Sequence, residues 1–67
     1  MKQVIVFGRG KYWNFKKERF LKNYKVIAFI DNAISQKLWD EKDKSYVYNP
    51  TLIATLPQVE ICCMSLD

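Results

Sequence analysis

The residues of this chain with the clearest chemical potential form a glycine-rich turn near the N-terminus. The segment Gly8-Arg-Gly-Lys11 follows a short apolar run and precedes a polar, helix-forming stretch. The first glycine permits a tight turn, and the second lets the backbone approach a pyrophosphate. A helix that begins here offers free N–H groups and a partial positive charge to an anion, and Arg9 and Lys11 add further positive charge. The turn therefore predicts phosphate binding.

A carboxylate follows at a distance that suits a dinucleotide. Asp31 ends the second apolar run, 23 residues after Gly8, close to the position of an acid that binds a ribose 2′-hydroxyl. Because such an acid repels a 2′-phosphate, it favours NAD over NADP. The third glycine of the usual fingerprint is replaced by Trp13, whose indole we expect to push the helix away or to turn outward over the loop. The alternative is that the glycines only shape a tight turn and Asp31 only caps a loop.

Other kinds of chemistry find little support. The chain has no histidine, which removes Ser-His and Cys-His nucleophile pairs and histidine metal sites. Asp40 and Glu41 lie in a lysine-rich stretch, where we expect them to be solvated partners of Lys42 and Lys44. We assign no catalytic and no metal-ligating residue, so the chain by itself is not expected to be an enzyme.

Two apolar runs and the segment between them predict the element that positions the turn. Gln3–Phe7 and Lys25–Ile30 are nearly continuous apolar runs, typical of parallel strands that are covered on both faces. Lys11–Tyr24 is rich in helix-forming residues, and its apolar side chains recur on one side of a helix, at Trp13, Phe20, Leu21 and Tyr24. Strand, turn, helix and strand form a βαβ unit, whose two strands are parallel and joined by a right-handed crossover.

The second half of the chain is expected to repeat this order more weakly. Ala33–Ser45 is polar and is predicted to be a loop with at most one helical turn. Asn49 suits the cap of a short helix with Pro50 at its first position. The remaining elements are two strands and that helix, at Ser45–Tyr48, Val59–Met64 and Thr51–Thr55. We predict one α/β domain over residues 1–67, with the order β-α-β-β-α-β and a parallel sheet of about four strands. Because no helix follows the last strand, we expect a truncated domain or a face that an oligomer covers.

Length and composition set further bounds. A chain of 67 residues buries only about 60% of its unfolded surface, so it forms one marginally stable domain at most. Its hydrophobic content of 49% argues against disorder. Cys62 and Cys63 are adjacent, match no zinc-site spacing, and are expected to be reduced core residues. No apolar run approaches a membrane span or a signal-peptide core, which predicts a cytoplasmic protein without a membrane partner.

The charge is unevenly distributed along the chain. Residues 1–25 carry eight basic side chains and one acidic side chain, whereas the remainder carries three basic and six acidic ones. The basic half is expected to be a solvated helix face or a contact for a phosphate ligand, an acidic partner or nucleic acid. Its lysines alternate with Tyr12, Trp13 and Phe15. Nucleic acid is the least favoured of these partners, because one basic helix without a recognised nucleic-acid fold is a weak signal.

Several short motifs resemble a known family. Val6–Tyr12, Tyr24–Asn32, and the later pattern Tyr46–Pro50 followed by Val59–Ser65 resemble the Rossmann-like N-terminal domain of bacterial surface-polysaccharide biosynthesis proteins. That domain accompanies nucleotide-sugar acetyltransferases, glycosyltransferases and methyltransferases. The resemblance implies a site that faces a nucleotide or nucleotide-sugar and consists of Gly8, Gly10, Lys11, Asp31, Asn32 and Ser65.

Two functional hypotheses follow from different classes. The first is a nucleotide- or nucleotide-sugar-binding accessory module, with NAD or a UDP-sugar as ligand and a catalytic partner domain elsewhere. The second is a protein-interaction or oligomerisation module without a small ligand. In the second case the apolar final strand, left partly uncovered, pairs with another copy or another domain.

Overall fold

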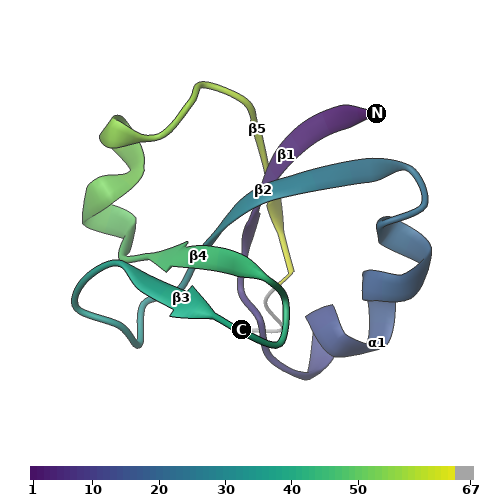
Figure 1. The fold of residues 1–67 in the computed structure, drawn as a ribbon, viewed down its shortest axis with the longest axis horizontal. Helices are drawn as coiled ribbons and strands as arrows, with labels where there is room; N and C mark the ends of the chain where they lie inside the picture. Colours follow the sequence, from purple (N-terminus) through teal and green to yellow (C-terminus); the bar gives the residue numbers. More distant parts are fainter. Residues whose placement is uncertain (65–67) are drawn as a thin grey trace.

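The computed structural model of the chain describes residues 1–64. They form a small mixed α/β fold with one five-stranded sheet in the order β3-β4-β2-β1-β5, one α-helix and one short 3₁₀ helix (Figure 1). The elements are β1 (Lys2–Phe7), α1 (Lys11–Phe20), β2 (Tyr24–Ile30), β3 (Leu38–Asp40), β4 (Ser45–Tyr48), the 3₁₀ helix η1 (Pro50–Thr55) and β5 (Glu60–Cys63). The described helices include none that is long and apolar enough to span a bilayer.

The sheet is mostly parallel. Strand β1 pairs in parallel with β2 on one side and with β5 on the other, and β2 pairs in parallel with β4. This confirms the predicted parallel pairing of the first two strands. Strand β3 is antiparallel to β4 and forms one edge of the sheet, so the prediction of a loop over Ala33–Ser45 is wrong at this point. A three-residue strand is too short to show an alternating pattern, and its edge-to-face contact between Trp39 and Tyr46 arises only across the hairpin.

The helices differ in detail from the prediction. Helix α1 ends at Phe20 rather than at Tyr24, which begins β2 instead. Leu21 caps the helix and is 43% exposed, so its predicted place on the buried side is wrong. The second predicted helix is the 3₁₀ helix η1, and the predicted cap is confirmed because the Asn49 side chain accepts a hydrogen bond from the backbone N–H of Thr51.

Helix α1 covers one face of the sheet through an aromatic core. Trp13 is 1% exposed and packs edge-to-face on Phe29 of β2 and on Phe20, with ring centroids 5.2 and 5.8 Å apart. Val6 and Val47 complete this buried cluster. One of the two predicted outcomes, an indole that turns outward over the loop, is therefore wrong. It fills the space between helix and sheet that a third glycine would have closed.

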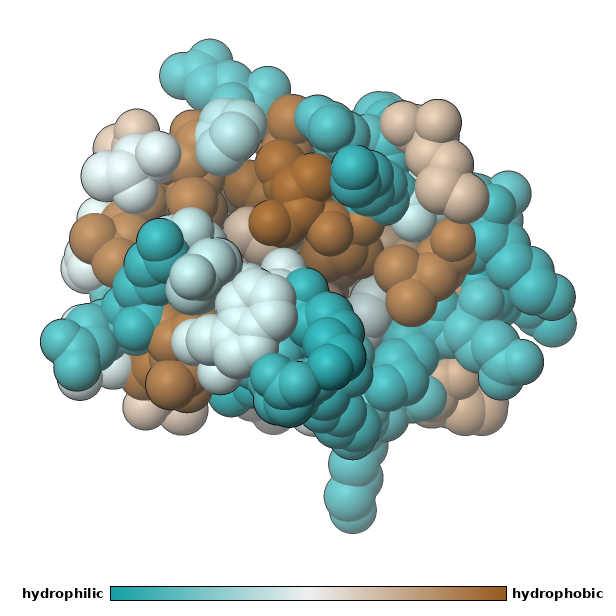
Figure 2. Space-filling view, viewed as in Figure 1, coloured by the Kyte–Doolittle hydropathy of each residue, from teal (hydrophilic) through white to brown (hydrophobic). Residues whose placement is uncertain are grey.

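The opposite face of the sheet is apolar but thinly covered. Its buried residues are Ile5, Ala28 and Ile30, and η1 has no buried residue of its own. A hollow of about 430 Å³ lies between η1, the segment that follows it, and the strands, and it is lined mainly by apolar residues. Ile53 and Ile61 at this hollow are 37% and 42% exposed. In Figure 2, hydrophobic atoms gather between the ends of the molecule that hold η1 and α1, with hydrophilic atoms around them.

Candidate functional site

The carboxyl ends of three neighbouring strands meet at one edge of the sheet, where Gly8 and Asp31 lie. Gly8 follows β1, Asp31 follows β2, and Met64 follows β5. Backbone hydrogen bonds join these exits, from Gly8 N–H to the Ile30 carbonyl at 2.9 Å and from Met64 N–H to the Phe7 carbonyl at 2.7 Å. From β1 the chain continues to β2 on one side, and it later returns to form β5 on the other side of β1. The strand order therefore reverses at β1. In open α/β sheets, ligands bind outside the carboxyl ends of strands at such a reversal.

The glycine turn has the geometry that its sequence predicts. Gly8 has a φ of 104°, a conformation that side-chain-bearing residues rarely adopt. Gly10 is the N-terminal cap residue of α1, and neither a side-chain cap nor an acidic residue in the first turn occupies this helix end. The leading N–H groups of an α-helix lack intrahelical partners and carry partial positive charge. A Cβ atom added to Gly10 would meet nothing within 4 Å, so the backbone here borders open space.

Arg9 connects two carboxylates at this edge. Its Nε donates to Oδ2 of Asp31 at 3.1 Å, and its terminal guanidinium nitrogen donates to Oδ2 of Asp40 at 2.5 Å. The side chains are partly buried, with exposed fractions of 24% for Arg9, 25% for Asp31 and 12% for Asp40. The positive charge predicted to attract phosphate is therefore already balanced by two acids. Asp40 was not predicted to belong to this site, because its contact with Arg9 spans 31 positions of the sequence.

Asp31 has two structural partners and capacity for a third. Its Oδ1 accepts a hydrogen bond from the backbone N–H of Ala33 at 2.8 Å, while Oδ2 accepts from Arg9. The first bond is the loop-capping role that the sequence left open as an alternative. A carboxylate has about four acceptor sites, so the partly exposed Asp31 can still accept a ligand hydroxyl.

Two further predicted ligand contacts lie at or near the same edge. Lys11 and Asn32 are exposed, at the start of α1 and directly after Asp31. Ser65 lies outside the described residues. The glycine turn, Lys11, Asp31 and Asn32 thus follow two adjacent strands, as the sequence predicted.

Asp40 is held as a carboxylate by its surroundings. Partial burial by itself raises the pKa of Asp40, but hydrogen bonds from Arg9 and from the backbone N–H groups of Asp43 and Lys42 lower it, and the pKa falls below its usual value. The expectation that Asp40 is a solvated partner of nearby lysines is therefore wrong. The expectation is confirmed for Glu41, which forms an exposed ion pair with Lys44 at 2.7 Å.

The turn between β3 and β4 is attached to α1 by polar contacts. Asp43 Oδ1 accepts a hydrogen bond from Trp13 Nε1 at 3.4 Å and lies 3.6 Å from Nζ of Lys17. Lys42 Nζ donates to Oδ1 of Asn14 at 3.0 Å. Together with the contact between Arg9 and Asp40, these bonds hold the hairpin beside the glycine turn. The opposite charges of the two halves of the chain are the one sequence signal for this arrangement.

The two cysteines are neighbours on the edge strand β5. Both are free, and residues 1–64 contain no group of three or more potential ligands that could hold a metal ion. Cys62 is half-buried, and burial raises the pKa of its thiol. Cys63 is exposed, so its predicted place in the core is wrong, because β5 forms an edge of the sheet.

Comparisons of the chain with protein-family models, with curated proteins and with solved structures gave no match.

Proposed function

We propose that the chain is a nucleotide- or nucleotide-sugar-binding module whose ligand lies at the carboxyl edge of the sheet. The observation that carries the proposal is the open space outside Gly10, at an uncapped helix N-terminus beside the reversal of strand order. A phosphate or pyrophosphate would accept hydrogen bonds from the first N–H groups of α1, with Lys11 close by. Gly8 supports this arrangement because its φ of 104° produces the tight turn.

In this proposal the carboxylates recognise the sugar rather than the phosphate. Asp31 accepts a ribose hydroxyl, which favours NAD or a UDP-sugar over a ligand with a 2′-phosphate. Arg9 acts as a positioning residue, since its two ion pairs hold Asp31 and the β3–β4 hairpin in place. Because Arg9, Asp31 and Asp40 together carry a net negative charge, phosphate binding depends on the helix terminus and Lys11.

The resemblance to Rossmann-like domains of surface-polysaccharide biosynthesis proteins supplies the biological setting of the proposal. In that setting the chain binds and presents the nucleotide, and a catalytic partner domain carries out the reaction. The absence of histidine from the whole chain supports this division of labour.

The proposal is tested by an NMR titration of the protein with NAD, NADP and UDP-glucose, comparing wild type with Gly10→Ala. For wild type we expect saturable amide shifts in Gly8–Trp13 and Asp31–Asn32. The affinity derived from them should be lower for NADP than for NAD. The added methyl group has space in the free protein but would occupy the approach of a pyrophosphate, so Gly10→Ala should lower affinity at least tenfold without unfolding the chain.

A control and a contradicting result complete this test. Ala54→Val adds methyl groups in η1, away from the glycine turn, and should leave the affinity unchanged. A well-dispersed spectrum without shifts at millimolar ligand would reject nucleotide binding.

A second candidate function, protein interaction, is favoured by the thinly covered face of the sheet. Ile53 and Ile61 are exposed beside the apolar hollow, and β5 is an edge strand with free hydrogen-bonding groups. Another copy or another domain could cover this face. Asp31→Ala separates the two functions, because it should lower ligand affinity and leave any assembly unchanged.

A further inference from the structure

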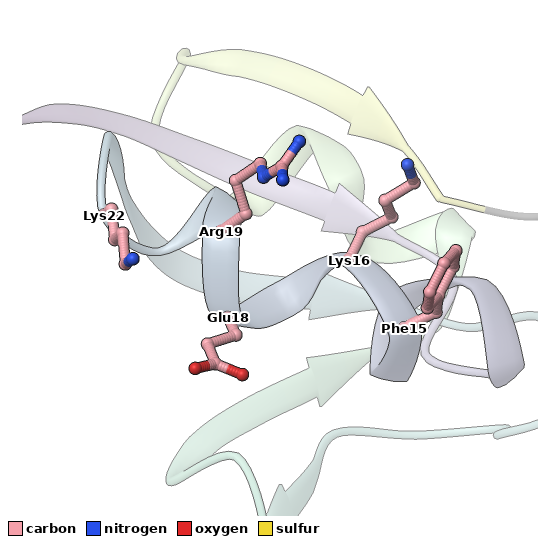
Figure 3. Close-up of a pocket in the computed structure, with 5 residues that line it drawn as sticks. All are labelled: Phe15, Lys16, Glu18, Arg19 and Lys22. Carbon is pink, nitrogen blue, oxygen red and sulfur yellow. The ribbon is translucent and has the colours of Figure 1, made fainter.

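The outer face of α1 carries a cluster of exposed cations. Its members are exposed, and no salt bridge within residues 1–64 involves them: Lys11, Lys16, Arg19 and Lys22. Lys17, by contrast, is half-buried and pairs with Asp43. Glu18 is the one acid of the helix, and Figure 3 shows its side chain directed away from those of Lys16 and Arg19.

An aromatic ring stands among these cations. Phe15 is 78% exposed, and the Nζ of Lys16 lies 5.2 Å from the centre of its ring. The same lysine lies 5.9 Å from the centre of the Tyr12 ring. A shallow hollow of about 420 Å³ along the helix is lined by Phe15, Lys16, Glu18, Arg19 and Lys22, so three of its five residues are cations and one is an acid (Figure 3). A large exposed ring beside several cations presents both a stacking surface and positive charge.

We infer that this face of α1 binds single-stranded nucleic acid without sequence preference. A base stacks on Phe15, and successive phosphates contact Lys16, Arg19 and Lys22. Aromatic side chains combined with a basic surface are the usual means of binding single strands, because every base has a π-face. The sequence alone made this partner the least favoured. The structure adds the exposure of Phe15 and shows that Lys16, Arg19 and Lys22 form no salt bridge within residues 1–64.

Two other polyanionic partners fit the surface less well. A membrane-binding helix needs a broad apolar face directed outward, whereas Trp13 and Phe20 of α1 pack against the sheet. Protein–protein interfaces are depleted in lysine, which supplies most of the charge on this face. Lysine and an exposed ring together favour a nucleic-acid strand.

The inference is tested by fluorescence anisotropy with a labelled 15-nucleotide oligothymidylate. Three phosphate contacts predict a slope of about −2 in a plot of log affinity against log salt, which is roughly a 20-fold loss of affinity between 50 and 200 mM salt. Phe15→Ala should weaken binding about fivefold or more at every salt concentration and leave that slope unchanged, because stacking is not electrostatic. Arg19→Glu should weaken binding at least tenfold and reduce the slope.

Lys37→Glu is the matched control, since it makes the same change of charge at an exposed lysine that contacts Tyr46 at the other side of the sheet. It should weaken binding less than threefold, and circular dichroism checks that each variant is folded. Gly10→Ala should bind the oligonucleotide normally, so this result is independent of the proposed nucleotide site.

Several outcomes would overturn the inference. One is the absence of oligothymidylate binding at 50 mM salt. Another is an equal loss of affinity for Lys37→Glu and Arg19→Glu. Binding to phosphatidylglycerol vesicles but not to oligothymidylate would identify a membrane surface. Polyglutamate could also compete for binding as effectively as unlabelled oligothymidylate, while Phe15→Ala leaves the affinity unchanged. That pair of results would identify an acidic protein as the partner.

Discussion

The two faces of the sheet are covered to very different degrees. On one face, ten-residue α1 inserts Trp13 between Phe20 and Phe29, and the β3–β4 turn adds a hydrogen bond to the indole through Asp43. On the other face, six-residue η1 has no buried residue and leaves Ile53 exposed. Ile5, Ala28 and Ile30 on this face are buried by partly buried neighbours such as Tyr48, Leu56 and Val59 rather than by a full helix. The first face is therefore expected to determine stability, and the second to be available for contact.

The largest expected effect that tests this contrast is the loss of the indole. Trp13→Ala should lower the free energy of unfolding by about 3–5 kcal/mol, which for a domain of this size leaves much of the chain unfolded. Leu56→Ala truncates a partly buried residue on the other face and should lower the free energy of unfolding by clearly less. Urea denaturation followed by circular dichroism measures both. An equal loss of unfolding free energy for the two variants would show that the two faces contribute equally to stability.

The next effect concerns the polar contact that holds the hairpin beside the glycine turn. Asp40→Asn should cost about 1–3 kcal/mol at pH 7, because a partly buried, charge-assisted hydrogen bond with Arg9 is weakened. The pKa of Asp40 is lowered in the folded state, so its contribution is present above the ordinary aspartate pKa of about 3.9 and is lost as pH falls through the lower folded value. The difference between wild type and variant should therefore shrink in acid.

Urea denaturation at pH 7 and at several values below pH 4 measures this dependence. Glu41→Gln, which changes a neighbouring but exposed ion pair, is the control and should alter stability little at any pH. A cost for Asp40→Asn that does not vary with pH would contradict the assignment to the ionised carboxylate.

The smallest expected effect on stability lies on the thinly covered face. Ile61→Lys replaces a 42%-exposed side chain of the edge strand β5 and should change the free energy of unfolding by no more than about 0.5 kcal/mol. If this face binds another copy, the same substitution should convert an associated wild type into monomer in sedimentation experiments. A wild type that stays monomeric at hundreds of micromolar would remove self-association as the second candidate function.

Elements with strong local signals were predictable, whereas contacts distant in sequence were not. The two apolar strands, the glycine turn and the Asn49 cap follow from short stretches whose patterns depend on local backbone geometry. Strand β3 and the early end of α1 depend on partners elsewhere in the chain. In the candidate site, the glycine turn and Asp31 were predicted, but Asp40 was not, because nothing near it in sequence indicates a contact with Arg9.

The sequence by itself determined the parallel pairing of β1 with β2, the turn that needs glycine at position 8, and the basic character of the first half. Apolar periodicity and φ preferences act within a few residues, so these features depend only on nearby positions in the sequence. Only the tertiary structure decided that Trp13 fills the core, that Arg9 is held by two acids, and that Phe15 is exposed beside Lys16. Burial and charge pairing depend on which segments meet in space, and that is a property of the whole fold.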